Sequence, residues 1–211
     1  MASEIQSGAI RLLLADDHPV MRDGLKFMLM RSDGITVVSE AADGIEAVEQ
    51  FATHRPNVVL IDLQMPRMEG LGAIARIREI DQRVAIVVLT TFRGDFRVAR
   101  ALAAGATSYL LKSTDTATIV AAIRNAAAGV ATISPEVAEE LSRFSLMQPL
   151  TEREIAVLRL AAQGKQNLAI SRRLCVSEEA VKSRIKNILQ KLDARDRTQA
   201  VMIATERGFL V

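Results

Sequence analysis

Short apolar runs punctuate the first 130 residues of the chain and alternate with segments whose apolar residues recur at helical spacing. The runs are rich in leucine and β-branched residues, and their unbroken apolar character is typical of strands buried on both faces of a parallel sheet. The predicted strands are Ile10–Ala15, Thr36–Val38, Val58–Ile61, Ala85–Leu89 and Ser108–Leu111. Five strand–helix repeats predict a doubly wound α/β domain that binds ligands at the C-terminal ends of its strands.

The pattern changes after residue 129, where the remaining chain has the periodicity of a series of short helices. Ser134, Pro135 and Glu136 make a favourable helix start, with serine as the N-cap and proline at the first helical position. We expect this helix to end near Phe144, so that Ser145–Gln148 forms a short connector.

The end of the chain is predicted to be a small helical domain. Thr151 and Glu154 have the spacing of a capping box, which begins a helix. Two amphipathic stretches joined by a two-residue turn then predict a helix-turn-helix: Asn167–Leu174, Cys175–Val176 and Ser177–Leu192. The chain is therefore predicted to comprise an α/β domain over residues 1–130, a linker with a short helix over 131–148 and an all-α domain over 149–211.

The composition is that of a soluble globular protein, with 49% hydrophobic and 25% charged residues. Its net charge of +2 conceals an asymmetry. Residues 1–127 carry 14 basic and 15 acidic side chains, whereas residues 128–211 carry 13 and 10. A slightly acidic first domain and a basic second domain indicate that the two have different partners.

Composition also excludes several classes of protein. Cys175 is the single cysteine, so an internal disulfide is impossible and a cysteine-based zinc site is disfavoured. His18 and His54 are the only histidines, and His18 is interpreted as a loop or helix-start residue rather than a metal ligand. There is no pattern of a signal peptide, and apolar runs such as Val84–Leu89 are too short to span a bilayer. We expect a cytoplasmic protein that does not enter membranes.

Polar residues follow four of the predicted strands. Asp16 and Asp17 follow the first strand, Asp62 follows the third, Thr90 ends the fourth and Lys112 follows the fifth. In a parallel sheet these ends meet at one edge, where three carboxylates repel one another unless a cation lies among them. Mg²⁺ is the favoured cation where few carboxylates and several waters share the ligation.

Together these side chains carry the functional groups needed to accept a phosphoryl group. The Asp62 carboxylate can attack in line while a bound metal and Lys112 neutralise charge on the transferring oxygens. Taken singly, an aspartate at a strand end is usually a turn or cap residue, and a lysine is usually solvated. Five such residues at the ends of four strands favour the functional interpretation.

Four motifs at these positions resemble the receiver domain of bacterial two-component response regulators, over about residues 9–130. They are Leu14–Pro19, Ile61–Pro66, Leu89–Thr91 and Tyr109–Lys112. The resemblance implies a flavodoxin-like sheet with Asp62 as the phospho-acceptor, loaded from a phosphohistidine on a sensor histidine kinase. It also implies that Asp17, Asp62 and the backbone carbonyl of Gln64 bind Mg²⁺, with Asp16 ligating through water.

By the same resemblance, Thr90 and Lys112 contact the phosphoryl oxygens, and Tyr109 is the aromatic switch residue whose rotamer follows Thr90. Two positions depart from the family's pattern. Ser113 stands where a proline often follows the lysine, so a cis bond is not expected there. Thr91 occupies a position often held by alanine, which would narrow access to the acceptor.

The second helix of the predicted helix-turn-helix has an apolar stripe on one side and a polar, basic face on the other. From Ala180 to Lys191 there are four basic residues and no acidic one. Such a face could enter the major groove of DNA and neutralise phosphates beside it, although an ordinary solvated helix has the same pattern.

Motifs across residues 148–211 favour DNA, because they resemble the LuxR-type DNA-binding domain. They are Leu150–Glu154, Val157-Leu158, Ala162–Gly164, Asn167, Val181–Ser183, Leu189–Leu192 and Arg197–Ala200. Joined to a receiver, the chain is similar to the NarL/FixJ class of response regulators. The family's base-contacting positions fall on Lys182, Ser183 and Lys186, with Arg184 near the DNA backbone. Its terminal helix, here about Asp196–Arg207, usually supplies the dimer contact on DNA.

Four residues of this domain depart from the family's pattern. Ala180 stands where threonine is common, Arg184 where histidine is frequent, and Cys175 and Asp193 where glycine is frequent. Arg184 adds a positive charge, so phosphate binding is not in question. The base sequence that the helix prefers is in question, because a changed recognition helix reads other bases.

The sequence as a whole predicts a phosphorylation-controlled transcription factor, which becomes a homodimer on activation and binds double-stranded operator DNA. We expect no independent turnover of a substrate, since Leu63 and Gln64 follow Asp62 and the D-x-D arrangement of phosphohydrolases is missing. Two alternatives remain open. One is a phosphotransfer module whose basic helices bind a protein, and the other is a DNA-binding regulator that works without phosphorylation.

Overall fold

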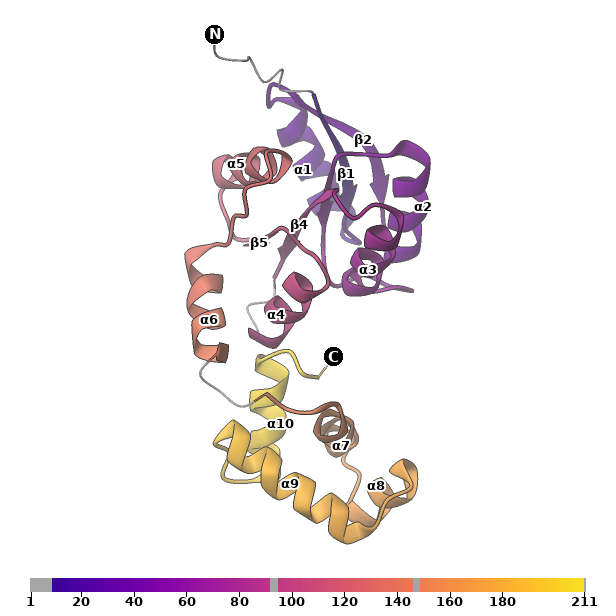
Figure 1. Ribbon diagram of the computed structural model, residues 1–211, viewed down its shortest axis with the longest axis vertical. Helices are drawn as coiled ribbons and strands as arrows, with labels where there is room; N and C mark the ends of the chain where they lie inside the picture. The colour runs from indigo at the N-terminus through magenta and orange to yellow at the C-terminus, as the bar shows by residue number, and fades with distance from the viewer. Residues whose placement is uncertain (1–8, 92–94, 146–148, 211) are drawn as a thin grey trace. The chain divides into compact units, whose positions relative to one another are not determined.

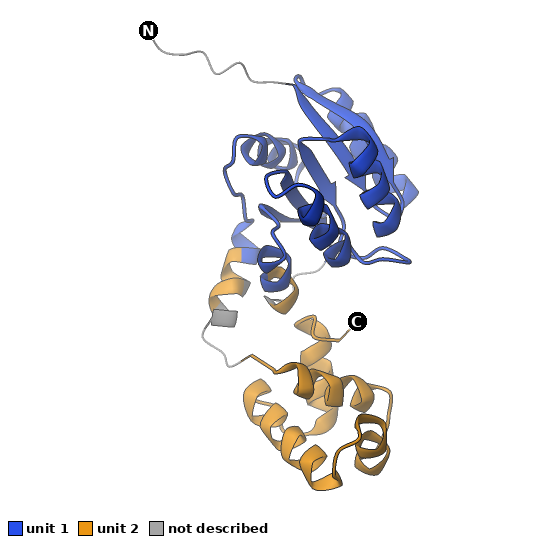
Figure 2. Ribbon diagram, turned by 45° about the vertical axis from the view of Figure 1, so that its right-hand side comes forward, with its two compact units in different colours: residues 1–91, 99–137 blue, residues 92–98, 138–211 orange. Residues whose placement is uncertain are grey.

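The computed structural model describes residues 9–91, 95–145 and 149–210, and the chain divides into two compact units (Figure 2). The first unit comprises residues 1–91 and 99–137, and the second comprises residues 92–98 and 138–211. Each unit has a hydrophobic core of its own. The domain boundaries proposed from the sequence, at residues 130 and 148, stay predictions.

The first unit contains a sheet of five parallel strands in the spatial order β2-β1-β3-β4-β5 (Figure 1). The strands are β1 (Ile10–Ala15), β2 (Ile35–Ala41), β3 (Val58–Ile61), β4 (Ala85–Thr90) and β5 (Ser108–Leu111). The helices that connect or follow them are α1 (Pro19–Met30), α2 (Gly44–His54), α3 (Gly70–Ile80), α4 (Asp95–Ala103) and α5 (Thr116–Ala127). The predicted doubly wound parallel sheet is confirmed.

Helices cover both faces of this sheet, as its buried strands require. Leu25 and Leu29 of α1 and Ile119 and Ile123 of α5 pack in one cluster with alternate residues of the strands. The α2 and α3 helices lie against each other on the opposite face (Figure 1). Because both faces are covered, the ends of the strands are where the sheet can present polar groups to a ligand.

The β2 strand is longer than the predicted Thr36–Val38, since it extends from Ile35 to Ala41. It lies at the edge of the sheet, and four of its seven residues are exposed or half-buried. Ser39 and Glu40 interrupt the apolar run there. Prediction from unbroken apolar runs therefore locates the strands that are buried throughout, but it gives too short a range for a strand that is partly exposed.

The α6 helix (Pro135–Ser145) begins where the sequence predicted and ends one residue after Phe144. Ser134 directly precedes Pro135, the first helical residue, as predicted, but its buried hydroxyl makes no hydrogen bond and so does not cap the helix. Its backbone N–H instead donates to the carbonyl of Tyr109 at 3.2 Å, which aligns this segment with β5. Residues 146–148 of the predicted connector lie outside the described residues.

Four helices make up most of the second unit: α7 (Glu152–Ala162), α8 (Asn167–Leu174), α9 (Glu178–Leu192) and α10 (Arg197–Glu206). The predicted capping box is confirmed, since Thr151 and Glu154 each accept a hydrogen bond from the other's backbone N–H. The predicted helix-turn-helix is α8 and α9, and its apolar stripe packs into the core. No helix among the described residues is long and apolar enough to cross a bilayer.

Candidate functional site

The carboxyl ends of four strands form one rim of the sheet in the first unit. Ala15 of β1 pairs with Ile61 of β3, and Thr90 of β4 pairs with Leu111 of β5. The residues at these ends are therefore neighbours, as the topology predicted. They are Asp16, Asp17, Asp62, Thr90 and Lys112.

Three carboxylates converge on this rim. One oxygen from each of Asp16, Asp17 and Asp62, together with a ring nitrogen of His18, lies within 4.8 Å of all the others. Asp16 and Asp62 are buried, and Asp17 is half-buried. Oδ1 of Asp17 is a buried atom that makes no hydrogen bond. Clustered oxygen ligands with one left unsatisfied fit a hard divalent cation, which the three aspartates could hold.

Lys112 is the positive charge that faces these carboxylates. Its Nζ lies 2.7 Å from Oδ2 of Asp16 and 2.7 Å from Oδ2 of Asp62, and its side chain is 6% exposed. Burial alone would lower the pKa of Lys112, but hydrogen bonds and Coulomb attraction from both aspartates outweigh it and raise the pKa. The ammonium group is therefore charged at neutral pH and is shared between two carboxylates.

Thr90 is fully buried at the end of β4, and its hydroxyl makes no hydrogen bond. A buried polar group without a partner is costly, so its presence beside the acidic cluster needs an explanation. A ligand oxygen at the rim would supply the missing acceptor. This unsatisfied donor is the feature that distinguishes the rim from an ordinary buried ion pair.

Tyr109 is fully buried on β5, three residues before Lys112. Its backbone N–H donates to the carbonyl of Thr132 at 3.0 Å, and its carbonyl accepts from the N–H of Ser134 at 3.2 Å. These bonds attach the segment after α5 to the outer edge of the sheet. The role of Tyr109 as a switch residue stays a prediction.

Other predicted residues lie around the rim. Gln64 is exposed in the loop after β3, and its backbone N–H donates to Oδ1 of Asp62 at 3.3 Å. Thr91 is exposed after the end of β4. No peptide bond in the described part of the chain is cis, so the bond that joins Lys112 to Ser113 is trans as expected. The Gln64 carbonyl as a metal ligand and Thr91 as a restriction on access stay predictions.

His18 contacts the carboxylates more closely than the sequence indicated. It is the N-cap residue of α1, which agrees with its interpretation as a helix-start residue. Its backbone N–H donates to Oδ1 of Asp16 at 2.9 Å. Its Nδ1 lies 2.6 Å from Oδ1 of Asp17, at an ion-pair distance but without the geometry of a hydrogen bond. Its position directly after the acidic pair is the signal that could have predicted these contacts.

The second unit presents a basic helix face of the kind that the sequence predicted. Val181 and Ile188 of α9 are buried in the core, whereas Lys182, Ser183 and Lys186 are exposed. Arg184, predicted near the DNA backbone, is half-buried. The helix is fixed at its start because the Ser177 hydroxyl accepts from the N–H of Ala180 at 3.1 Å. The Lys182 ammonium lies 3.2 Å from Glu178 Oε1 on the same face.

Basic residues outside α9 also lie on the surface of this unit. Lys165 precedes α8, and Arg172 and Arg173 lie in its last turn; all three are exposed. The sequence predictions for DNA contacts did not include them, although the charge count over residues 163–197 was a signal. In helix-turn-helix proteins generally, the first helix crosses the phosphate backbone of DNA.

An ion pair ties α9 to the start of α7. Lys191 Nζ lies 2.8 Å from Oε2 of the buried Glu154 and 3.2 Å from the carbonyl oxygen of Pro149. Burial would raise the pKa of Glu154, but Lys191 and the hydrogen bonds from Thr151 outweigh it and lower the pKa. The capping glutamate therefore also anchors the end of α9, which its sequence signature did not predict.

Two family models match the chain. Residues 12–124 match the response regulator receiver domain, and residues 148–204 match the bacterial regulatory proteins of the luxR family. The chain is 38% identical over 208 residues to the transcriptional regulatory protein YdfI of Bacillus subtilis, covering 95% of this chain and 97% of that protein. It is 36% identical over 207 residues to the response regulator protein VraR of Staphylococcus epidermidis, covering 96% and 99%.

Solved structures agree with these matches. The response regulator ChrA of a heme-sensing two-component system is 34% identical, with a TM-score of 0.57 over 96% of this chain and 99% of that one. RcsB from Salmonella enterica serovar Typhimurium is 23% identical, with a TM-score of 0.74 over 94% and 98%, and supports the fold. The family consists of regulators rather than enzymes that turn over a substrate. The chain belongs to the LuxR-type (NarL/FixJ) two-component response regulators, with a receiver domain and a LuxR-type DNA-binding domain.

Proposed function

We propose that Asp62 accepts a phosphoryl group from the phosphohistidine of a sensor histidine kinase, and that the chain then binds operator DNA as a dimer. The observation that carries this proposal is the buried Thr90 hydroxyl, which lacks a hydrogen-bond partner beside Asp62 and Lys112. A carboxylate nucleophile, an ammonium and a hydroxyl donor at one rim are the functional groups that a site needs to accept a phosphoryl group.

The transfer follows from these groups. A carboxylate oxygen of Asp62 attacks phosphorus, the bond from phosphorus to the kinase imidazole breaks, and an aspartyl phosphate forms as the imidazole leaves. Lys112, which is charged at neutral pH, turns from the carboxylates to a phosphoryl oxygen. The Thr90 hydroxyl, which has no other hydrogen-bond partner, donates to a second phosphoryl oxygen. These contacts stabilise charge where it develops, which is the main source of catalysis in phosphoryl transfer.

Mg²⁺ is the proposed cofactor, held by Asp17, Asp62 and the backbone carbonyl of Gln64, with Asp16 ligating through water. When bound, it supplies positive charge to the phosphoryl oxygens. The cluster of carboxylate oxygens supports it, as does Asp17 Oδ1, a buried oxygen that accepts no hydrogen bond. Without it, the single positive charge of the Lys112 ammonium faces three carboxylates and contacts two of them, Asp16 and Asp62.

An apolar groove beside the rim supports a protein as the phosphoryl donor. The groove has a volume of ≈590 Å³ and lies between α1 and α5. Its apolar lining includes Met21, Leu25 and Ile119, and it reaches Lys112 and Thr91 at the rim. A helix of the kinase that carries the phosphohistidine would be guided to Asp62 along this path.

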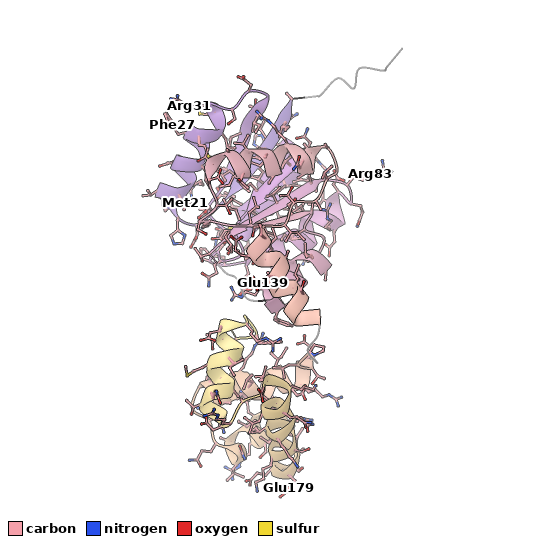
Figure 3. The ribbon with its side chains drawn as sticks, turned by 90° about the vertical axis from the view of Figure 1, so that its left-hand side faces the viewer. Met21, Phe27, Arg31, Arg83, Glu139 and Glu179 are labelled. Carbon is pink, nitrogen blue, oxygen red and sulfur yellow. The ribbon has the colours of Figure 1, made fainter. Side chains whose placement is uncertain are left out.

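The outer surface of α1 extends this apolar surface. Val20 is 87% exposed and Phe27 is 65% exposed, and Met30 is exposed as well. Figure 3 shows Met21, Phe27 and Arg31 on this helix at the outside of the unit. Because the chain leaves several large apolar side chains in water on one helix, we infer that α1 is covered by the kinase during transfer.

Regulation by phosphorylation needs contacts that differ between two states of the receiver. Thr90 is the proposed sensor, since its hydroxyl gains a partner only when the phosphoryl group is present. Tyr109 is the proposed aromatic switch on the neighbouring strand. The exposed Lys182, Ser183 and Lys186 of α9 are the proposed DNA contacts, with Arg184 beside the backbone. The half-exposed surface of α10, with Met202 at 58% exposure, is the proposed dimer contact on DNA.

The test is a measurement of stoichiometry and size on the full chain. With a small phosphoryl donor and Mg²⁺, one phosphoryl group per chain is expected by mass spectrometry, together with a shift from monomer to dimer in sedimentation. Asp62→Asn keeps the shape of the acceptor and removes its nucleophile, so it should remain unlabelled and monomeric. Multiple turnovers of the donor, or labelling of the asparagine variant, would refute the proposal.

A further inference from the structure

The loop between β3 and α3 follows Asp62 directly and folds back on itself. The N–H of Gly70 donates to the carbonyl of Leu63 at 2.9 Å and closes the loop. A Cβ atom on Gly70 would clash with the backbone of Asp62, so the two ends of the loop touch through their main chains. Leu63 and Met65 are buried, which fixes its inner side. The shape of this loop therefore determines where the Gln64 carbonyl lies.

Arg67 lies on the outer side of this loop in a conformation that arginine rarely adopts. Its φ of 60° is in the left-handed region, where glycine would be unstrained. The Arg67 side chain is 60% exposed, but its Nε donates to Oδ2 of Asp43 at 2.7 Å, and its Nη2 contacts the same oxygen. The chain thus keeps an unfavourable backbone conformation at the one residue of the loop that forms an ion pair with α2.

Asp43 divides its two oxygens between two partners. Oδ1 caps α2 by accepting from the N–H groups of Ile45 at 2.9 Å and Glu46 at 3.0 Å. Oδ2 binds Arg67. Burial would raise the pKa of Asp43, but the Glu46 N–H and the Arg67 guanidinium outweigh it and lower the pKa. The carboxylate is therefore ionised at neutral pH and holds both the helix and the loop.

The main chain makes a second connection between the same two elements. The N–H of Gly44, the first residue of α2, donates to the carbonyl of Met68 at 3.1 Å. A Cβ atom on Gly44 would clash with that carbonyl group, so the helix start and the loop are in direct contact. The start of α2 and the loop after β3 can approach this closely because residue 44 is glycine. The ion pair of Asp43 and Arg67 adds a second link between the same two elements.

We propose that the ion pair of Asp43 and Arg67 positions the loop after the phospho-acceptor, and thereby sets how tightly the rim binds Mg²⁺. This inference rests on the proposed function, in which the Gln64 carbonyl is a Mg²⁺ ligand. Asp43 and Arg67 are positioning residues, because they act through the loop and touch none of the three carboxylates. Partners that orient a metal ligand in this way typically change metal affinity by about 10- to 100-fold when they are removed.

The first measurement is Mg²⁺ binding to the full chain by isothermal titration calorimetry. Arg67→Ala and Asp43→Asn are each expected to raise the dissociation constant about 10-fold. Asparagine caps helices as well as aspartate does, so the second variant removes the charge and keeps the cap. The double variant should bind no more weakly than either single one, because both substitutions break the same pair. Arg67→Lys, which keeps the charge, should restore part of the affinity.

Two further variants separate positioning from general stability. Arg67→Gly removes the ion pair and also the strain of a left-handed backbone conformation at a residue other than glycine. Its melting temperature should therefore stay the same or rise, while its Mg²⁺ affinity falls. Arg76→Ala is the matched control, since Arg76 is an exposed arginine on α3 that pairs with Glu79 at 3.2 Å. It should leave Mg²⁺ binding unchanged. The phosphorylation rate of Arg76→Ala should also match that of the unaltered chain.

The outcomes distinguish this inference from the proposed function. If the unaltered chain binds Mg²⁺ and Arg67→Ala, Asp43→Asn and Arg76→Ala all bind it equally well, the positioning role is wrong and the proposed function stands. If affinity falls only in proportion to the melting temperature, the pair is merely structural and the inference is again wrong. If the unaltered chain binds no Mg²⁺, the proposed metal site fails, and this inference fails with it.

Discussion

The acidic rim of the first unit and the basic face of α9 in the second differ in how their charges are held. At the rim, Asp16, Asp62 and Lys112 are buried side chains at contact distance, and each is fixed by the strand that it follows. On α9, Lys182 and Lys186 are exposed, and their positions depend on the helix alone. Under the proposed function, the rim is a preorganised site for one small charged group, whereas the helix face binds a large polyanion.

The two kinds of charge obey different physics. Buried charges interact strongly and tolerate no loss of a partner, because the group left behind is desolvated. Exposed charges are screened by salt and contribute small increments. Substitutions at the rim should therefore have large effects, and substitutions on α9 should have small effects that depend on ionic strength.

The largest effect is expected at the acceptor itself. Asp62→Ala removes the nucleophile, so phosphorylation by a small donor with Mg²⁺ should fall to background, as measured by intact-protein mass spectrometry. Asp23→Ala removes a carboxylate from α1 outside the cluster and is the control. Labelling of the Asp62 variant to the level of the control would mean that the acceptor lies elsewhere.

Lys112→Ala should have the next largest effect. It removes the charged donor that contacts Asp16 and Asp62, and loss of one such donor typically slows a reaction by about 10²-fold. The rate of phosphorylation at saturating Mg²⁺ is the measurement. Mg²⁺ itself should bind at least as tightly, since a competing positive charge has gone. A variant that is phosphorylated at the normal rate would show that Lys112 only balances charge.

Glu154→Gln tests a buried ion pair in the second unit, where the charges of the basic face are exposed. It removes the charge that Lys191 binds and keeps the shape of the cap, and we expect a loss of about 2 kcal/mol in unfolding free energy by urea titration. Because the pKa of Glu154 is lowered on folding, its contribution is present above the usual pKa of 4.5 and is lost as the pH falls through the folded value. The variant should lack this acid dependence. Glu152 is exposed, so Glu152→Gln should unfold like the unaltered chain. Equal losses of unfolding free energy in the two variants would show that the ion pair of Glu154 with Lys191 does not stabilise the unit.

Lys186→Ala should produce a smaller effect that depends on salt. If Lys186 contacts a phosphate, its removal should lower the slope of the logarithm of the DNA association constant against the logarithm of salt concentration by about 0.9. If it contacts a base, its removal should cost about 1–3 kcal/mol of binding free energy for the preferred sequence alone. Fluorescence anisotropy with an operator and a scrambled duplex distinguishes the two. Lys182→Ala should lose less, since Glu178 already pairs with that lysine. Binding that ignores salt in every variant would argue against DNA as the partner.

Cys175→Gly should have the smallest effect. Cys175 adopts a φ of 51° after α8, a conformation that glycine reaches without strain, so stability should change by no more than about 1 kcal/mol and in the stabilising direction. A thermal melt measures the change. A loss of DNA binding without a loss of stability would mean that the cysteine side chain itself contacts the partner.

The rim was predictable because topology alone brings it together. Apolar runs identified the strands, and a parallel sheet places the residue after each strand at one edge, so Asp16, Asp62 and Lys112 could be predicted to meet. What the sequence did not predict depends on local side-chain geometry. The close approach of His18, the unpartnered hydroxyl of Ser134 and the pairing of Arg67 with Asp43 arise from contacts that no periodicity encodes.

The basic face was predictable in its chemistry but not in its extent. Periodicity separated the buried stripe of α9 from its exposed side correctly, because burial of a helix follows a regular repeat. The exposed Lys165, Arg172 and Arg173 lie outside that repeat and were not predicted. The ion pair of Glu154 with Lys191 joins residues 37 positions apart, and only the folded unit shows it.

The link between the two sites is tested most directly by operator affinity. Binding of a duplex selected from genomic DNA is measured for the unaltered chain and for Asp62→Ala, each with and without a phosphoryl mimic and Mg²⁺, at one fixed salt concentration. We predict that the mimic tightens binding by the unaltered chain, which then binds as a dimer, and leaves the variant unchanged. If both proteins bind equally well under all conditions, or if the mimic strengthens the variant as it does the unaltered chain, phosphorylation of Asp62 does not control DNA binding.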